Sequence, residues 1–160
     1  MPFLGFSQDI SEENQPEITT YYLIRHAEKD RTNPNDPNPE LTRKGYFRAE
    51  GWAKVFDKIP LDAIYSTSYN RTLMTAFHTS QKKKIEITLY DPKEMYSQEF
   101  QQKTKGKKVL IVGHSNTTPA FVNAIIDEKR YKDMADDDNS SLYVVTLIGD
   151  QSSVEIFTIN

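Results

Sequence analysis

Two of the three histidines in this 160-residue chain stand directly after short apolar runs. His26 and its neighbour Arg25 follow the run 20–24, and His114 follows the run 109–112. An imidazole can act as a nucleophile or carry a proton near neutral pH, and a guanidinium is a planar fork of donors that matches a tetrahedral oxyanion. These residue types therefore point to chemistry on an anionic group.

A second arginine, Arg71, follows a third apolar run, 61–65, and stands at the start of a predicted helix. In an open parallel sheet, ligands bind outside the carboxyl ends of the strands. We therefore expect Arg71 to meet Arg25, His26 and His114 at one edge. Phosphate fits this set best, because a carboxylate or sulfate would leave the two imidazoles without a clear task.

The elements that must position these side chains alternate between short apolar runs and stretches with a helical period. This alternation predicts an α/β fold, a three-layer sandwich with a mostly parallel central sheet, helices on both faces and a C-terminal antiparallel hairpin. The expected parallel strands are 20–24, 61–65, 85–89 and 109–112, and the hairpin strands are 142–148 and 154–159 with a turn of three to four residues. The expected helices are 42–56, 69–79 and 117–126, with a less regular one over 92–104.

The domain is expected to span residues 19–160. Residues 1–18 are predicted to form a flexible N-terminal tail, because residues 9–18 are polar, contain Pro16 and show no apolar period. The small and apolar residues 1–8 could be the remnant of a signal peptide. Both a cytoplasmic and a periplasmic location are therefore left open.

Composition excludes several classes of function. The chain has no cysteine, which rules out disulfide scaffolds, cysteine zinc sites and thiol catalysis. Its net charge is −3 and its lysines lie in short clusters between neutral or acidic segments, so no nucleic-acid platform is indicated. No apolar run reaches the roughly 18–20 residues needed to span a bilayer, and no H-E-x-x-H or comparable spacing implies a metal.

The segment 113–117 (GHSNT) offers a competing interpretation, because it resembles the G-x-S-x-G elbow of serine hydrolases, with Ser115 as the nucleophile. The final glycine of that motif is missing here. In that fold the catalytic histidine follows the nucleophile, and no histidine follows Ser115 in this chain. We therefore reject a serine hydrolase.

Several motifs in this sequence resemble those of the histidine phosphatase, or phosphoglycerate mutase-like, superfamily. They run in the order of that superfamily from Thr20 to Ile126, roughly two-thirds of the chain. The motifs are Arg25-His26-Ala27-Glu28, Leu41-Thr42 with Gly45 and Ala49, Tyr65-Ser66 with Arg71 and Thr75-Ala76, and Gly113-His114-Ser115.

The resemblance implies a metal-independent phosphatase without a cofactor. His26 aligns with the histidine that becomes phosphorylated, and Arg25, Arg71 and His114 align with the pocket that binds the phosphoryl group. Ser115 is expected to contribute to substrate binding. Water would then hydrolyse the phosphohistidine.

The acid that protonates the leaving group is less clearly marked. The superfamily often has a glutamate just past its third strand, where this chain has Asp91, and we take Asp91 as the expected acid. Glu28 and Glu94 are the competitors, and Glu28 is also a candidate for substrate binding. Two departures from the superfamily pattern affect the phosphate loop. Ala27 replaces the usual glycine, and the Ser/Thr and Asn that follow in mutases are replaced around Lys29.

The expected substrate is a phosphorylated small molecule or a phosphoprotein, since the short chain resembles the small phosphohistidine phosphatases. A mutase-type phosphotransferase is less favoured, because the chain lacks the long insertion that closes over the sugar phosphate in mutases. A non-catalytic phosphate-binding module of the same fold stays as the alternative.

Overall fold

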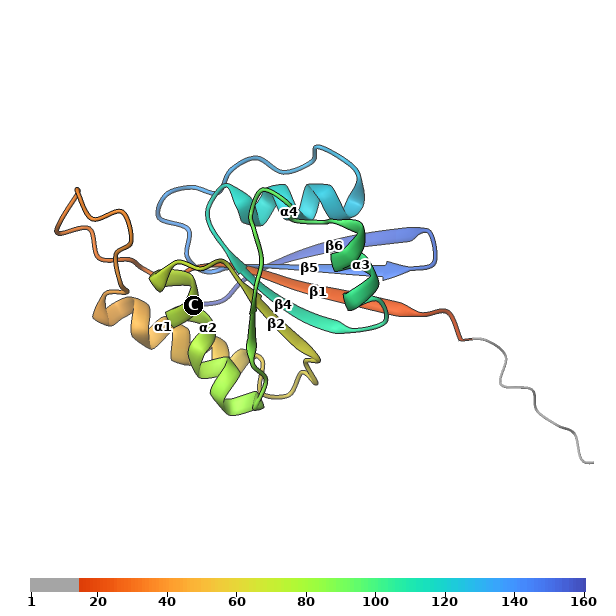
Figure 1. The fold of residues 1–160 in the computed structure, drawn as a ribbon, viewed down its shortest axis with the longest axis horizontal. Helices are drawn as coiled ribbons and strands as arrows, with labels where there is room; N and C mark the ends of the chain where they lie inside the picture. The colour runs from red at the N-terminus through yellow and green to blue at the C-terminus, as the bar shows by residue number, and fades with distance from the viewer. Residues whose placement is uncertain (1–14) are drawn as a thin grey trace, which may run out of the picture.

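The computed structural model describes residues 15–160, which form one six-stranded sheet with strand order β3-β2-β4-β1-β5-β6 (Figure 1). The first 14 residues of the predicted tail lie outside the described residues, and β1 begins at Ile18. The strands are β1 (Ile18–Arg25), β2 (Ala63–Ser66), β3 (Ile87–Leu89), β4 (Lys108–Gly113), β5 (Ser141–Ile148) and β6 (Gln151–Thr158). The helices are α1 (Arg43–Val55), α2 (Asn70–Lys83), α3 (Gln98–Thr104) and α4 (Thr117–Ile126).

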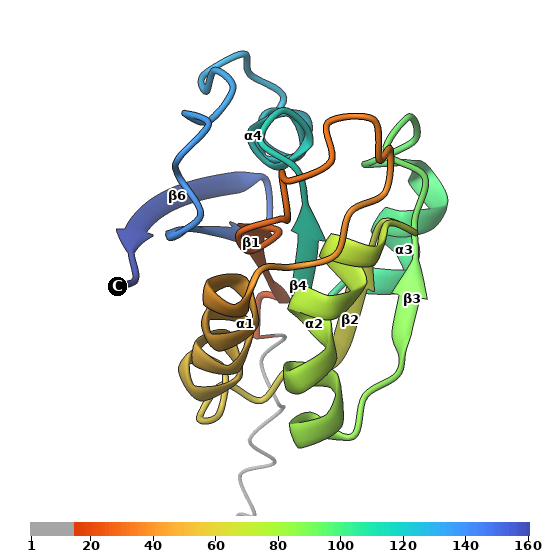
Figure 2. The same ribbon diagram turned by 90° about the vertical axis from the view of Figure 1, so that its left-hand side faces the viewer.

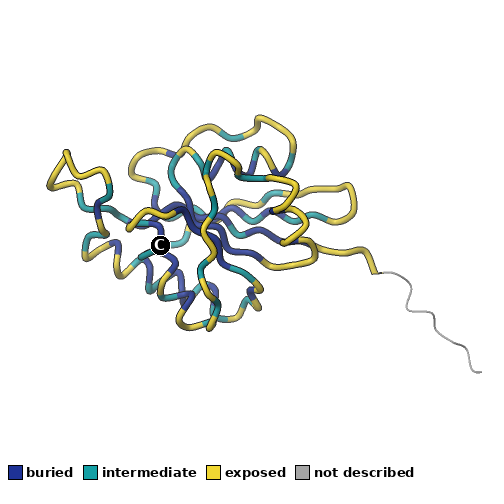
Figure 3. Tube along the Cα trace, viewed as in Figure 1, coloured by how far each residue is buried: buried dark blue, intermediate teal, exposed yellow. Residues whose placement is uncertain are grey.

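The central strands β1 and β4 are buried on both faces, as their continuous apolar runs predict. They pair in parallel, with Leu23 opposite Ile111 and Arg25 opposite Gly113. Figure 3 shows this buried centre in dark blue, surrounded by exposed loops. The chemistry-bearing residues that follow β1 and β4 therefore emerge side by side at one edge.

Helices cover both faces of the sheet. Figure 2 shows α1 and α2 on one side of the sheet and α4 on the other. Alternate strand residues serve the two layers: Leu23 and Ile111 pack with Phe121 of α4, whereas Ile24 packs with Trp52 of α1. The predicted α/β sandwich is confirmed.

The C-terminal strands differ in detail from the prediction. β5 pairs antiparallel with β1, and β6 pairs antiparallel with β5, as expected for a hairpin. Its turn has two residues rather than three to four, because the polar residues 151–153 continue the ladder. Gly149 in this turn has φ 60°, a left-handed conformation that glycine adopts without strain.

Two other predicted elements are shorter than expected. Strand β3 has three residues and pairs on one side only, with β2. Helix α3 begins at Gln98 because the Ser97 side chain accepts a hydrogen bond from the Phe100 N–H and caps it there, so residues 92–97 precede the helix. Between residues 15 and 160, no helix combines the length and the apolar character needed to cross a membrane.

Candidate active site

The carboxyl ends of β1 and β4 bring the two strand-end histidines together. The backbone N–H of His26 donates to the Gly113 carbonyl over 2.9 Å, and the centroids of the His26 and His114 rings are 5.5 Å apart. An open hollow of about 340 Å³ lies over them. It is lined by Arg25, His26, Lys29, Tyr69, Arg71, Pro92, His114, Ser115, Asn116, Thr117 and Asp136.

Gly113 makes room for the close packing at the end of β4. A Cβ atom at this position would lie 2.9 Å from the Thr117 hydroxyl oxygen and 3.0 Å from the hydroxyl oxygens of Thr118 and Tyr90. The Thr117 hydroxyl itself accepts a hydrogen bond from the His114 N–H over 2.9 Å. The strand end and the start of α4 can therefore approach closely enough to hold His114 at the hollow.

The His26 ring has a defined tautomer. Its Nδ1 lies 2.7 Å from the Ala27 carbonyl oxygen, which can only accept a hydrogen bond, so Nδ1 carries the proton. The other nitrogen, Nε2, is then left with a lone pair when the ring is neutral. This is the arrangement that nucleophilic attack by an imidazole requires.

The surroundings of His26 favour the neutral ring. Burial lowers the pKa of His26 to about 3, and the nearby Arg25, Arg71 and His114 add to this effect, although the hydrogen bond to the Ala27 carbonyl opposes it. The ring is therefore neutral, with its one proton on Nδ1, over the whole physiological pH range. Nε2 of His26 therefore has a free lone pair without first having to lose a proton.

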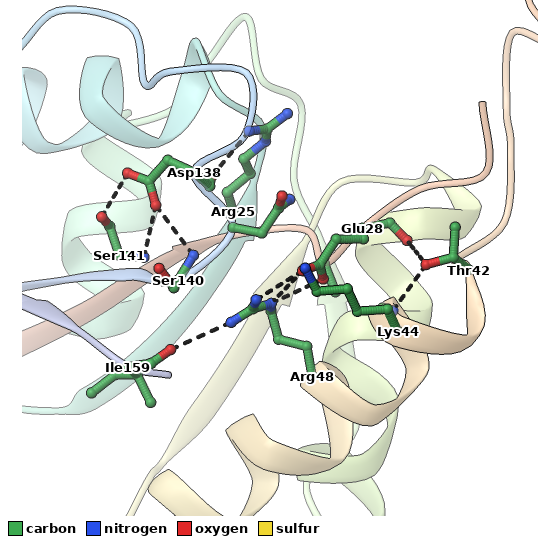
Figure 4. A network of polar contacts seen from close by, with 12 residues as sticks. Arg25, Glu28, Thr42, Lys44, Arg48, Asp138, Ser140, Ser141 and Ile159 are labelled. Carbon is green, nitrogen blue, oxygen red and sulfur yellow. Dashed lines mark hydrogen bonds and ion pairs between the residues drawn. The ribbon is translucent and has the colours of Figure 1, made fainter.

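Arg25 is held by the loop that precedes β5. Its Nη1 donates to the carbonyl oxygens of Ala135, Asp136 and Asp138 over 3.1, 2.9 and 3.0 Å. Figure 4 shows this side chain reaching the loop at Asp138. The Nε of Arg25 is buried and has no hydrogen-bond partner among the described residues, so this donor is left for a ligand.

Arg71 is less constrained by the protein. Its guanidinium lies 4.5 Å from the centre of the Tyr69 ring, a cation–π contact. Its buried Nε and Nη1 have no hydrogen-bond partner among residues 15–160. Buried donors without acceptors are costly, and an oxyanion in the hollow would satisfy them.

Thr75 ties the start of α2 to the His26 loop. Its hydroxyl oxygen accepts from the Ala27 N–H over 2.8 Å and donates to the Arg71 carbonyl over 2.7 Å. The four-residue spacing between Arg71 and Thr75 places both on one face of α2. Arg71 is thereby positioned beside His26, with which it lines the hollow.

The candidate acids lie in different surroundings. Asp91 is exposed and accepts the Lys93 N–H over 2.8 Å, next to Pro92, which lines the hollow. Glu94 is exposed three residues further on and does not line the hollow.

Glu28 does not line the hollow over the two histidines. Its carboxylate receives Nε and Nη2 of Arg48 over 2.8–3.0 Å and has Lys44 at 3.5 Å (Figure 4). Partial burial alone would raise the pKa of Glu28, but the hydrogen bonds from Arg48 and its charge outweigh burial and hold the pKa below its usual value. Glu28 is thus held as a carboxylate that connects the His26 loop to α1.

The structure adds residues that the sequence reasoning missed, most of them in the acidic loop before β5. The Asn139 amide donates to the His26 carbonyl over 3.0 Å. Asp136 lines the hollow and pairs with Arg31 at 3.0 Å. Lys29 also lines the hollow, and no carboxylate of the described residues lies within ion-pair distance of it. The run of polar residues 136–139 directly before an apolar strand was the one available signal.

The part of the chain that the structure describes contains no cluster of three or more histidine and carboxylate side chains able to hold a metal ion. What the site offers is a neutral imidazole nitrogen beside two arginines with free donors. This arrangement can bind a tetrahedral anion and attack it.

Comparison with known proteins agrees with this description. The model of the histidine phosphatase superfamily (branch 1) matches residues 21–92, which contain the first three motifs. This match and the fold confirm the resemblance to the histidine phosphatase superfamily that the sequence motifs carry. No curated protein sequence gives a significant match.

Solved structures with the same fold are phosphatases and related proteins. One is named phosphohistidine phosphatase SixA, from Agrobacterium tumefaciens, with 22% identity, a TM-score of 0.64, and coverage of 88% of this chain and 98% of that chain. A mycobacterial glucosyl-3-phosphoglycerate phosphatase in complex with VO3 has 11% identity, a TM-score of 0.70, and coverage of 89% and 100%. A phosphoserine phosphatase from Entamoeba histolytica has 14% identity, a TM-score of 0.64, and coverage of 85% and 94%.

Proposed function

We propose that this protein is a phosphatase that hydrolyses a phosphomonoester or a phosphohistidine through a covalent intermediate on His26. The observation that carries the proposal is the His26 ring, whose Nδ1 donates to the Ala27 carbonyl and whose Nε2 therefore keeps its lone pair. The unpartnered donors of Arg25 and Arg71 lie at the same hollow.

In the first step, Nε2 of His26 attacks phosphorus and the bond from phosphorus to the leaving oxygen or nitrogen breaks. The guanidinium groups of Arg25 and Arg71 stabilise the charge on the phosphoryl oxygens, and Arg25 needs no reorganisation because three carbonyl oxygens already hold it. In the second step, water attacks the phosphohistidine, which releases orthophosphate and restores His26.

The leaving group takes up a proton as it departs. Asp91 stays the proposed acid, since it flanks Pro92 at the border of the hollow. Glu28 is a weaker proposal, both as the acid and as a substrate contact, because Arg48 and Lys44 already engage its carboxylate. An aryl phosphate has a good leaving group that depends little on any acid, so it is a suitable first substrate for testing the nucleophile.

The test is His26→Ala with an aryl phosphate as substrate. We expect the wild-type protein to turn over and to carry an acid-labile phosphoryl label after brief incubation, and His26→Ala to lose both. His78→Ala is the matched control, because His78 lies on α2 against Tyr46, does not line the hollow, and its replacement should leave turnover unchanged. Full activity in His26→Ala would refute the proposal.

The substrate is sought among the compounds for which the structural relatives are named. A screen would cover a phosphohistidine peptide, phosphoserine and a sugar phosphate such as glucosyl-3-phosphoglycerate. Vanadate binding without turnover of any of these would instead indicate a non-catalytic phosphate-binding module.

A further inference from the structure

The Tyr69 side chain contacts two of the residues that line the hollow over the two histidines. The Arg71 guanidinium carbon lies 4.5 Å from the centre of the Tyr69 ring, a cation–π contact. The His114 ring lies edge-to-face with the Tyr69 ring, with 5.0 Å between the centroids and 82° between the planes. Tyr69 itself also lines the hollow. One aromatic ring thus joins an arginine at the start of α2 to a histidine that follows β4.

The contact with Tyr69 suits an arginine whose donors are left for a ligand. Arg25, by comparison, uses Nη1 to donate to three carbonyl oxygens. The buried Nε and Nη1 of Arg71 have no hydrogen-bond partner among residues 15–160. A cation–π contact attracts the guanidinium to the face of the ring and occupies no N–H group, whereas a carboxylate would occupy the donors and cancel the charge. Tyr69 can therefore hold Arg71 in place without competing with an oxyanion.

Tyr69 stands at a helix position that other residue types stabilise better. It is the N-cap residue of α2, with φ −80° and ψ 146°, and its side chain makes no capping hydrogen bond. Serine, threonine, aspartate and asparagine are favoured at this position, because their side-chain oxygens accept N–H groups of the first turn. A tyrosine forgoes that stabilisation, so its presence here is better explained by its contacts with Arg71 and His114 than by helix stability.

The loop 33–39 compensates in part for the missing cap. The Asn38 Oδ1 accepts the Asn70 N–H over 2.8 Å, and the Asn70 side-chain amide donates to the Asn38 carbonyl over 3.1 Å. An N–H group in the first turn of α2 is thereby satisfied by a residue 32 positions away in the sequence. The asparagine- and proline-rich loop thus supports the start of α2, and the Tyr69 side chain is left to contact the site.

We propose that Tyr69 is a positioning residue that holds the Arg71 guanidinium and the His114 ring at the hollow while it leaves the Arg71 donors free for an oxyanion. Tyr69 acts through these two residues and forms no bond to the reacting atoms. The aromatic ring, and not the phenolic hydroxyl, is the part that this task requires. The effect of Tyr69 on turnover rests on the proposed function, whereas its effect on oxyanion binding does not.

The first test measures the Kd of inorganic vanadate by calorimetry, which requires no turnover. Tyr69→Phe keeps the ring and should keep the vanadate Kd within about two-fold of the wild-type value. Tyr69→Leu keeps apolar bulk but has no π face, and should raise the Kd about five- to ten-fold. Phe77→Leu is the matched control, because Phe77 is an exposed aromatic residue of the same helix that does not line the hollow, and its replacement should leave the Kd unchanged.

Tyr69→Asn separates positioning from helix stability. Asparagine is a favoured N-cap residue, so this variant should unfold at a higher urea concentration than Tyr69→Leu. Its vanadate Kd should nevertheless rise about as much as that of Tyr69→Leu, because neither side chain offers a π face. Tyr69→Asn also serves as the test if Tyr69→Leu does not fold. If vanadate affinity followed the urea midpoint across these variants, the role of Tyr69 would be structural only and the inference would fall.

Turnover shows whether Tyr69 acts through Arg71. Tyr69→Leu should lower kcat/KM for an aryl phosphate about ten-fold, and Tyr69→Phe should stay within about two-fold of the wild-type value. In an Arg71→Ala background, the same Tyr69→Leu change should lower kcat/KM by no more than about three-fold, because the cation–π contact is already lost. A full ten-fold loss in that background would exclude a role through Arg71.

Two further outcomes overturn the inference: a folded Tyr69→Leu with the wild-type vanadate Kd, or a Tyr69→Phe that is impaired as strongly as Tyr69→Leu. Failure of the proposed function looks different. If the wild-type protein hydrolyses no phosphorylated substrate but binds vanadate, and Tyr69→Leu weakens that binding while Tyr69→Phe does not, Tyr69 still positions Arg71 and only its part in turnover falls. A wild-type protein that binds neither vanadate nor orthophosphate overturns both proposals.

Discussion

Arg25 and Arg71 present the same chemical group to the hollow but are held in different ways. Arg25 satisfies three carbonyl oxygens of the loop before β5 and is only 3% exposed, so it is part of the fold as well as of the site. Within residues 15–160, Arg71 makes no hydrogen bond through its buried Nε and Nη1. At the residue scale, substitution of Arg71 should therefore affect activity alone, whereas substitution of Arg25 should affect both activity and stability.

Arg71→Ala should lower kcat/KM for an aryl phosphate by about 2–4 kcal/mol in transition-state stabilisation, roughly 30- to 1000-fold, by analogy with the removal of one oxyanion donor. Its free energy of unfolding should stay within about 0.5 kcal/mol of the wild-type value, because the removed donors have no partners. Steady-state kinetics and urea unfolding measure the two effects. An unchanged kcat/KM would exclude Arg71 from the phosphate site.

Arg25→Ala is the informative comparison. It should lose activity and in addition destabilise the fold, since three carbonyl oxygens lose a charged donor. If both variants were equally stable, the loop before β5 would not depend on Arg25.

The sequence was sufficient to predict that two arginines and two histidines line one hollow, because three of these residues lie at or just past strand ends whose common edge follows from a parallel sheet. It could not reveal the contact of the Thr67 hydroxyl with Nε2 of His114, or the contact of the Asn139 amide with the His26 carbonyl. Those contacts join residues 47 and 113 positions apart and depend on how loops close over the sheet, which no local pattern encodes.

At the scale of elements, the start of α1 is docked onto the chain just after His26. The Glu28 carbonyl oxygen accepts from the Thr42 N–H over 2.8 Å and from its hydroxyl over 3.2 Å. The Thr42 hydroxyl oxygen in turn accepts the Gly45 N–H over 3.0 Å and caps the helix. A Cβ atom on Gly45 would lie 2.3 Å from the Glu28 carbonyl oxygen, so only glycine fits there.

Two glycines of α1 give a matched pair of substitutions. Gly45→Ala should destabilise the protein by about 1–3 kcal/mol, because backbone must move to admit the methyl group. Gly51→Ala, in the same helix, meets no atom within 4 Å and should stabilise the protein by roughly 0.5–1 kcal/mol through helix propensity. Urea denaturation measures both. Equal effects at the two positions would mean that α1 is not held against Glu28.

The predicted elements succeeded where periodicity and a cap coincided. Helix α4 has the predicted bounds, and α1 begins one residue inside the predicted helix 42–56, directly after Thr42, whose side chain caps it. The predicted ranges for β3 and α3 were too long, because edge strands and short helices bury little surface and their ends depend on single local contacts such as the Ser97 cap. The exposed edge residue Leu89 shows how weakly β3 is embedded.

For the molecule as a whole, burying two imidazoles in a cationic hollow has a thermodynamic consequence. Burial lowers the pKa of His26 to about 3 and that of His114 to about 4, and Arg25 and Arg71 contribute to both shifts. The unfolded chain binds protons at these histidines below about pH 6.5, whereas the folded chain does not. Acidification through this range therefore favours the unfolded state.

The free energy of unfolding should accordingly fall as the pH is lowered from 6.5 to about 4, with each of the two imidazoles contributing up to about 1.4 kcal/mol per pH unit. Carboxylates titrate in the same range, so the measurement is the difference between the wild type and a His26→Asn/His114→Asn variant, by urea denaturation in phosphate-free buffer. The variant should lose stability less steeply, and His78→Asn, which leaves both site imidazoles in place, should follow the wild type. Parallel pH profiles for the wild type and the double variant would show that the histidines are not held neutral by the fold. A steeper wild-type profile would instead mean that the fold keeps His26 and His114 neutral and is less stable at acidic pH as a result, a cost that an oxyanion in the hollow would offset by accepting hydrogen bonds from Arg25 and Arg71.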